Sequence, residues 1–172
     1  MERQGGATDE FEAFIARAHS GLVRFGTLLL GDAGKGEDLV QVALIKTYGA
    51  WGRLSDPAAA GAYTRKVMVR EAGRWRRRRW AGEEATGALP EDVQAGDASD
   101  QLVEHLRLVD ALRSLPVSQR AVVLLRFLEG RSEAETAALL GISIGTVKSR
   151  SSRGLAALRA LGALDDDVLE PG

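Results

Sequence analysis

The stretch "SEAETAALLGISIGTVKSRSSRGLAAL", from Ser132 to Leu158, decides the fold because it carries the signals for two short helices joined by a tight turn. Ser132 followed three residues later by Glu135 is a capping box, which predicts that a helix begins there. Gly141 supplies a left-handed residue that ends this helix, and Ser143 can cap the next one. The stretch therefore has the dimensions of a helix-turn-helix.

The second helix of this motif separates into an inner and an outer side when it is wound at about 100° per residue. The inner side, expected to pack on the first helix, holds Val147, Ser151, Gly154, Leu155 and Leu158. The outer side combines cations with short hydroxyl side chains and holds Thr146, Lys148, Ser149, Ser152 and Arg153. Such a surface suits the phosphates and base edges of a DNA major groove. Arg150 lies near the boundary, so phosphate positioning or a salt bridge suits it better than base reading. The alternative is a solvated helix that packs only inward.

A second basic segment, residues 62–80, contains eight Lys or Arg against one acidic residue, whereas residues 81–110 contain one against eight. Four consecutive arginines, Arg76–Arg79, point all round a helix, which favours contact with a phosphate backbone over a single row of ion pairs. Aromatic side chains beside arginines can stack on unpaired bases. For Trp75 we expect partial burial instead.

Apolar residues at helical spacing predict an amphipathic helix from Phe11 to Leu29 and further helices over 36–51 and about 58–80. Residues 81–99 are rich in Gly and acids with almost no apolar periodicity, which is typical of a flexible linker. The helical period restarts at Leu102, and a further helix is expected over 115–130, where only "AVVLLRFL" could be a strand. The predicted fold is all-α: two small helical domains joined by an acidic linker, the second a four-helix domain.

The helix expected over 36–51 has apolar residues on two sides. One side holds Leu39, Val40, Ala43, Leu44 and Thr47, while Val42 and Ile45 lie on the other, beside Asp38 and Gln41. A second apolar stripe on a surface helix needs a partner, either in this chain or on another protein.

Together these segments resemble the extracytoplasmic-function (ECF) sigma factors of bacterial RNA polymerase, and most closely their SigE-like actinobacterial group. "GEDLVQVALIKTYGAW" is similar to the family's polymerase-clamp-binding helix and "AYTRKVMVREAGRWRRRR" to its promoter-melting helix. "LPVSQRAVVLLRFLEGRSEAETAALLGISIGTVKSR" is similar to its carboxy-terminal domain. The resemblance implies a sigma-2-like domain over 1–80, a linker over 81–99, a sigma-4-like domain over 100–165 and an acidic tail over 166–172.

The resemblance also implies a function: binding core RNA polymerase and directing promoter-specific transcription initiation. The polymerase contacts would be the clamp of its largest subunit, through Asp38, Gln41, Val42 and Ile45, and the flap of its second largest subunit. The minus-ten DNA would contact Tyr63, Arg65, Lys66, Arg70, Arg74, Arg76, Arg77, Arg78 and Arg79. The minus-thirty-five duplex would contact Thr146, Lys148, Ser149, Arg150, Ser152 and Arg153. An anti-sigma factor is a further candidate partner.

Two residues depart from the family pattern. Arg70 stands where the family commonly has an asparagine, which affects base preference at that position. Ser151 stands where the family usually has a larger apolar residue, which is expected to weaken the inner packing of the second helix by about 1–2 kcal/mol.

The sequence also argues against other classes of protein. It has no cysteine and only two histidines, His19 and His105, so no metal site and no cofactor are predicted. "GDAGKG" over 31–36 has the wrong spacing for a phosphate-binding loop and is expected to be a flexible loop between helices. No catalytic constellation is recognisable, so we expect no enzyme and no small-molecule substrate. Without a signal peptide or an apolar span, we expect a cytoplasmic protein that does not bind membranes.

Two rival hypotheses stay open at this point. One is a free-standing helix-turn-helix repressor or activator, whose amino-terminal domain binds a ligand or dimerises. The other is an adaptor whose acidic linker and tail bind a protein partner. The Asp38–Ile45 face distinguishes a sigma factor from the repressor, because a sigma factor needs it to bind core polymerase and a repressor does not.

Overall fold

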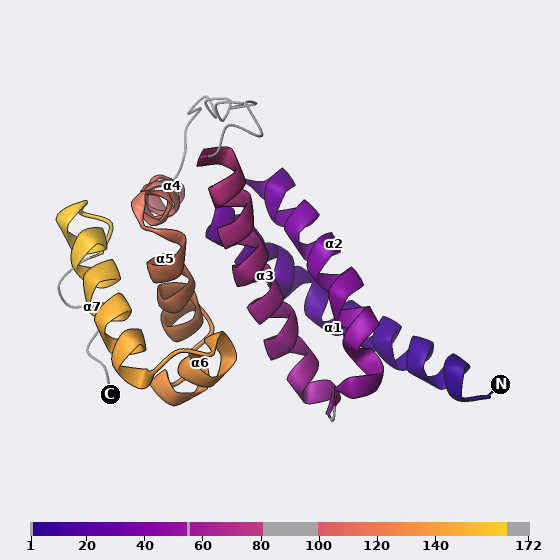
Figure 1. Ribbon diagram of the computed structural model, residues 1–172. Helices are drawn as coiled ribbons and strands as arrows, with labels where there is room; N and C mark the ends of the chain where they lie inside the picture. The colour runs from indigo at the N-terminus through magenta and orange to yellow at the C-terminus, as the bar shows by residue number, and fades with distance from the viewer. Residues whose placement is uncertain (1, 55, 81–99, 165–172) are drawn as a thin grey trace.

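The computed structural model describes residues 2–54, 56–80 and 100–164, and these form helices and connecting turns without a strand (Figure 1). The N-terminal half comprises α1 (Glu2–Leu30), α2 (Ala33–Ala50), the 3₁₀ turn η1 (Trp51–Arg53) and α3 (Pro57–Trp80). The C-terminal half comprises α4 (Asp100–Ser114), α5 (Val117–Val123), the π-helical turn η2 (Leu124–Leu128), α6 (Glu133–Leu140) and α7 (Ile144–Ala160). The all-α prediction is confirmed. The expected linker and acidic tail lie outside the described residues.

In the N-terminal half, α1, α2 and α3 pack around a shared apolar core. The predicted stripe of α1 contributes Leu22, Phe25 and Leu29, which are fully buried, and α3 contributes Met68. The side of α2 predicted to face this core is buried except for Leu44, which is half-buried.

The prediction of a flexible loop over 31–36 is wrong, because α2 already begins at Ala33. Asp32 caps this helix by accepting a hydrogen bond from the Lys35 amide at 2.8 Å. Gly36 lies at a close approach of α1 and α2: a Cβ there would come within 2.6 Å of the Thr27 backbone nitrogen. Gly36 therefore serves helix packing and not loop flexibility.

In the C-terminal half, the predicted helix-turn-helix is confirmed. Ser132 and Glu135 form both hydrogen bonds of the capping box, at 3.1 and 2.7 Å, and these bonds lower the pKa of the Glu135 carboxyl. Gly141 takes the left-handed conformation at φ +68°, and the Ser143 hydroxyl accepts from the Thr146 amide at 3.1 Å. Both helix starts and the turn between them are therefore set by local hydrogen bonds.

The inner side of α7 packs more broadly than predicted. It contacts α5 as well as α6, with Val147 and Leu158 fully buried. Val147 also joins Ala137 and Val122 in a small apolar cluster that Ile142 partly covers. Ser151 is 8% exposed on this side, and its hydroxyl has no hydrogen-bond partner.

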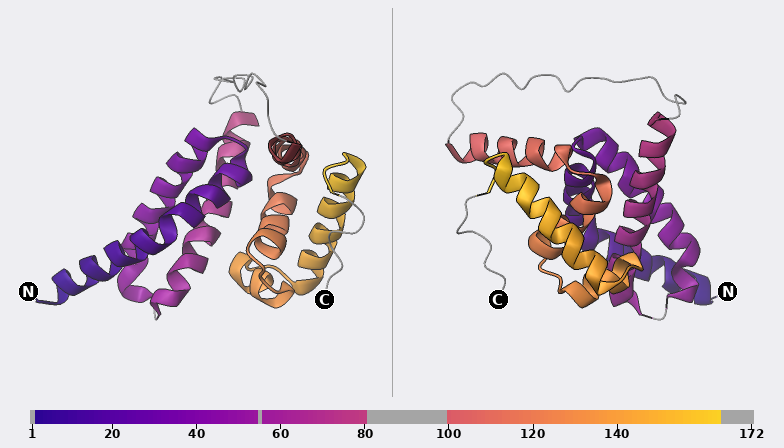
Figure 2. Two further views of the ribbon diagram at one scale, coloured as in Figure 1. Left: turned by 180° about the vertical axis from the view of Figure 1, so that it is seen from behind. Right: turned by 60° about the vertical axis from the view of Figure 1, so that its left-hand side comes forward.

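The two halves pack against each other, with α5 and α6 beside α3 and with α4 and α5 against α1 (Figure 2). One apolar cluster runs through both halves, from Leu29 of α1 to Leu115 and Val123 of the C-terminal half. A hydrogen bond of 2.5 Å from Arg120 of α5 to the Leu29 carbonyl joins them as well. One side of α3 is therefore covered by the C-terminal half.

We predict that Ser151→Ala raises the free energy of unfolding by about 1–2 kcal/mol, because it removes a buried hydroxyl that has no partner. The neighbouring Ser152 is exposed on the same helix, so Ser152→Ala supplies a matched control that changes helix propensity alone, by about 0.5 kcal/mol or less. Urea unfolding of both variants measures the difference. A Ser151→Ala variant less stable than the parent would show that the hydroxyl has a stabilising partner.

Candidate functional site

The outer side of α7 is a solvent-facing surface with cations at both ends of a row of hydroxyls. Lys148, Ser149, Ser152 and Arg153 are exposed, while Thr146 and Arg150 are half-buried. Lys148 has one weak ion pair, at 3.8 Å to Glu133 of α6, and Ser149 donates to the Thr146 carbonyl at 3.1 Å. Exposed ion pairs of this kind contribute little to stability, so the lysine can exchange this partner for another anion. All six predicted residues thus belong to one continuous strip.

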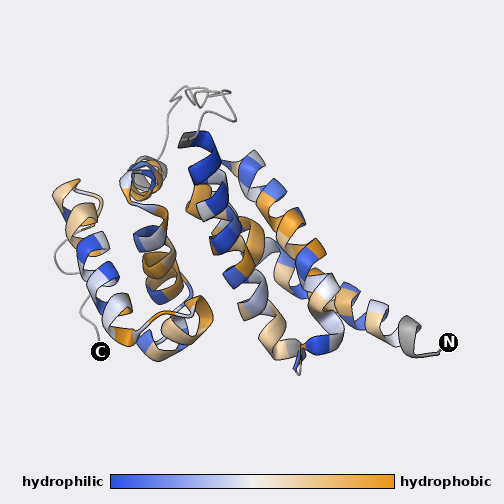
Figure 3. Cartoon of the chain, viewed as in Figure 1, coloured by the Kyte–Doolittle hydropathy of each residue, from blue (hydrophilic) through white to orange (hydrophobic). Residues whose placement is uncertain are grey.

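The basic residues of α3 divide between two sides of the helix. At about 100° per residue, one side combines Tyr63, Lys66, Arg70, Arg74 and Arg77. The three arginines of this set are exposed, and the tyrosine and the lysine are half-buried. We call this set the solvent side of α3. Arg65, Arg76 and Arg79 lie roughly opposite, and Arg78 lies between the two sides. The upper end of α3 is the most hydrophilic part of the helix (Figure 3).

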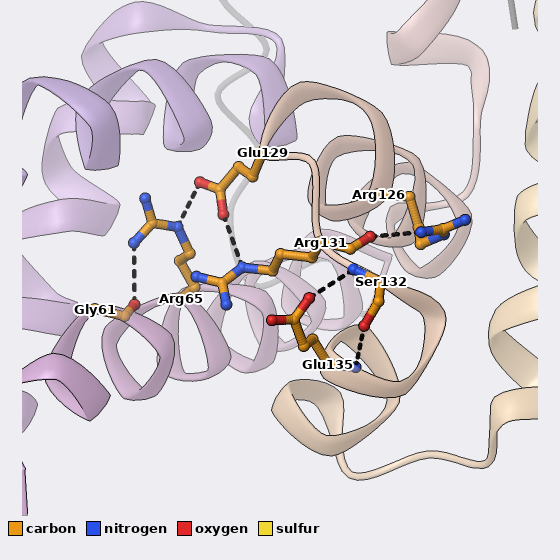
Figure 4. Close-up of polar contacts among 7 residues, drawn as sticks. All are labelled: Gly61, Arg65, Arg126, Glu129, Arg131, Ser132 and Glu135. Atoms are coloured by element: carbon orange, nitrogen blue, oxygen red, sulfur yellow. Dashed lines mark hydrogen bonds and ion pairs between the residues drawn. The ribbon is translucent and has the colours of Figure 1, made fainter. Parts of the chain in front are cut away.

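Arg65 lies in a polar network between the two halves of the chain (Figure 4). Its Nε donates to Glu129 Oε1 at 2.5 Å, and both side chains are only 14% exposed. A second donor, Arg131 Nε, reaches the other carboxylate oxygen of Glu129 at 3.2 Å. Arg65 also donates to the Gly61 carbonyl at 3.1 Å. In this arrangement Arg65 is an interface residue, unlike the exposed arginines of the solvent side.

Glu129 is a functional candidate that sequence reasoning missed. It follows η2 and precedes the capping box, so its local sequence indicated only the end of a helix. Its partner Arg65 is 64 residues away, and no local pattern connects the two.

Buried polar contacts fix α2 relative to α3. Glu71 of α3 is buried and contacts both Lys46 of α2 and Arg74, the latter at 3.3 Å. The hydroxyls of Thr47 and Thr64 lie 3.0 Å apart in the same interface. The outward side of α2 is thus held in a defined orientation with respect to the solvent side of α3.

The outward side of α2 carries the second apolar stripe expected from the sequence. Ile45 is 73% exposed, Asp38 and Gln41 are exposed, and Val42 is half-buried. Tyr48, which the sequence analysis did not single out, extends the stripe by one turn and is also exposed, with its ring 4.9 Å from that of Phe11. No part of the chain that the structure describes covers Ile45, so the stripe is open to another protein.

The two histidines do not form a site in the described part of the chain. His19 is exposed on α1, and the side chain of His105 lies outside the described residues. Among the described residues, no group of three His, Asp or Glu side chains is placed to hold a metal ion. None of the described helices combines the length and apolar content that crossing a bilayer requires.

Comparison with known proteins matches both halves of the chain to one family. Residues 13–82 match the family model for sigma-70 region 2, and residues 105–158 match that for sigma-70 region 4. The RNA polymerase sigma-E factor of Streptomyces coelicolor is 42% identical over 150 residues, covering 87% of this chain and 84% of the relative. The ECF RNA polymerase sigma factor SigM of Mycobacterium tuberculosis is 31% identical over 159 residues, covering 92% and 80%.

A solved structure shares the fold across both halves. It is the sigma factor RpoE of Bartonella quintana in complex with the anti-sigma factor NepR, with a TM-score of 0.72 and 27% identity. The match covers 90% of this chain and 98% of that one. Family models and relatives agree on the family, and the solved structure shares its fold. The chain therefore belongs to the extracytoplasmic-function sigma factors of bacterial RNA polymerase, of the SigE type.

Proposed function

We propose that this RNA polymerase sigma factor reads the minus-thirty-five element with α7, engages the minus-ten element with α3 and binds core polymerase through the outward side of α2. The observation that carries the proposal is the exposed strip of α7, which the helix-turn-helix presents to solvent. Its hydroxyl side chains are short enough for the helix to enter a major groove, where Lys148 and Arg153 can reach phosphates or guanine edges. Caps and the apolar cluster hold the helix in a fixed orientation.

For the minus-ten element, the solvent side of α3 supports the proposal. Four of its five residues are cations, and a row of cations along one helix suits a phosphate backbone. Tyr63 on the same side supplies an aromatic surface for an unpaired base. Arg65 is only 14% exposed and lies opposite this side of the helix, so it can join the contact only if the interface that holds Glu129 opens.

For core polymerase, the exposed stripe on α2 supports the clamp contact. An isoleucine that is 73% exposed beside Asp38 and Gln41 combines an apolar anchor with polar groups at its rim, a composition common at protein interfaces. A free-standing repressor would have no use for this stripe next to an arginine-rich helix. We extend the proposal to an anti-sigma partner, because the RpoE relative with the same two-half fold is held by NepR.

We predict that Ile45→Glu weakens binding to core polymerase by about tenfold or more, since it places a charge in the centre of an apolar contact. Leu161→Glu is the matched control: Leu161 is 57% exposed after α7 and belongs to none of the proposed surfaces. Both variants should have the same urea midpoint of unfolding as the parent, and Leu161→Glu should bind polymerase with the parent's affinity. Equal binding by both variants in a pull-down titration with purified core enzyme would contradict the clamp assignment.

We predict that substitutions in the two DNA surfaces impair different steps of transcription initiation. Arg153→Ala should reduce run-off transcription mainly on promoters that depend on the upstream element, with a loss of about 1–3 kcal/mol in duplex affinity. Changing Arg70, Arg74 and Arg77 together to Ala should impair melting. It should also reduce the slope of log K against log salt concentration for single-strand binding by about two, as expected for three lost phosphate contacts.

A pre-opened template distinguishes the roles proposed for the two DNA surfaces. It should restore transcription by the triple variant of α3 but not by Arg153→Ala on the upstream-dependent promoter. If it rescues neither variant, the melting role proposed for the solvent side of α3 is wrong.

A further inference from the structure

A cleft of about 940 Å³ lies where the two halves meet, between the C-terminal end of α3, the end of α1, the start of α2 and the α4–α5 corner. Six of its lining residues are cations, and they come from both halves of the chain. They are Lys35, Arg76, Arg78, Arg79, Arg113 and Arg120, against one lining carboxylate, Asp38. The cleft therefore has a strong excess of positive charge.

Arg120 is the most deeply placed of these cations, at 6% exposure. Its guanidinium donates to three backbone carbonyls, those of Leu29, Arg113 and Leu115, at 2.5 to 2.8 Å, while its Nε has no partner. Burial, together with the charges of Arg76 and Arg113, lowers its pKa to about 10. A buried charge is normally paired with an opposite one, but the charged groups that influence Arg120 here have its own sign.

The other cations of the cleft are also poorly neutralised by the residues that the structure describes. Arg76, Arg78 and Arg79 are exposed and form no ion pair with any described residue. Arg113 has a single contact, 3.7 Å from the exposed Asp110 on its own helix. Exposed pairs at that distance contribute little. The cleft thus offers several guanidinium groups whose donors are available to a ligand.

We propose that this cleft binds a polyphosphate anion of up to nucleotide size. Guanidinium groups match phosphate oxygens in pairs and bind them more strongly than they bind neutral acceptors. The volume lies within the range of small-molecule sites, and Trp75 adds a half-buried aromatic surface to the lining. Several cations converging on one space favour a ligand with several negative charges over a single carboxylate.

This site is distinct from the solvent side of α3, although Arg76, Arg78 and Arg79, which the family resemblance assigns to minus-ten DNA, line it. Arg77 belongs to that surface and does not line the cleft, whereas Arg79, two residues on, does. Arg113 and Arg120 come from the C-terminal half and belong to neither proposed DNA surface. A ligand that contacts arginines of both halves would therefore stabilise their packing against each other.

The test is calorimetric titration of the full chain with inorganic pyrophosphate in about 0.15 M salt, where charges farther apart than roughly 8 Å are largely screened. We expect saturable binding of one pyrophosphate. Arg79→Ala should weaken it by about tenfold, the loss expected for a charge-assisted hydrogen bond. Arg77→Ala removes the same charge from the same helix outside the cleft, and it should change the affinity less than about twofold.

A second matched pair tests the contribution of the C-terminal half. Arg113→Ala should weaken pyrophosphate binding as Arg79→Ala does, and Arg107→Ala, an exposed arginine of α4 outside the lining, should not. Neither residue belongs to a proposed DNA surface, so this result is independent of promoter recognition. Circular dichroism melting of all four variants establishes that each is folded. Arg79 is exposed, so its replacement by Ala is not expected to destabilise the fold.

Absence of saturable binding would overturn the proposal. Equal losses of pyrophosphate affinity in the cleft variants and in their controls would also overturn it, because they would indicate general attraction of the anion to the arginines. A parallel titration with ADP identifies the source of the phosphate group. Tighter binding of ADP than of pyrophosphate, with the difference removed by Trp75→Leu, would support a nucleotide. Equal affinities would support a free polyphosphate.

Discussion

Arg120 makes the contact on which the arrangement of the two halves depends. It lies on α5, yet it donates to Leu29 in the last turn of α1 and to Arg113 at the end of α4. Carbonyls in the last turn of a helix lack intrahelical partners and carry partial negative charge, so a guanidinium is well suited to satisfy them. A single side chain therefore joins three helix segments at the junction of the halves. The buried charge of Arg120 is thus held by backbone carbonyls and not by a carboxylate.

The packing of the halves divides the arginines of α3 between two environments. Arg65 is paired with Glu129, which also accepts from Arg131, whereas Arg70, Arg74 and Arg77 remain exposed on the other side of the helix. A run of basic residues that looks uniform in sequence thus consists of interface residues and surface residues. Residue spacing alone cannot distinguish them, because the distinction depends on which side of α3 the C-terminal half covers.

The features that sequence reasoning predicted well are those determined by neighbours within one or two turns. The capping box at Ser132, the turn at Gly141 and the two sides of α7 follow from local hydrogen bonds and helical periodicity. The features it missed join distant residues: Arg65 with Glu129, and Arg120 with a carbonyl 91 residues away. The loop predicted over 31–36 failed for a related reason, since Gly36 is required by its contact with α1 and only the fold reveals that contact.

Closure of the two halves and DNA binding compete at particular side chains. Arg65 is only 14% exposed at the interface with Glu129, so a minus-ten contact that uses Arg65 requires this interface to loosen. An anion in the cleft would act in the opposite direction, because it would bridge arginines of both halves. By linkage, DNA that favours the loosened arrangement would then lower the affinity for the anion by the same factor as the anion lowers the affinity for DNA.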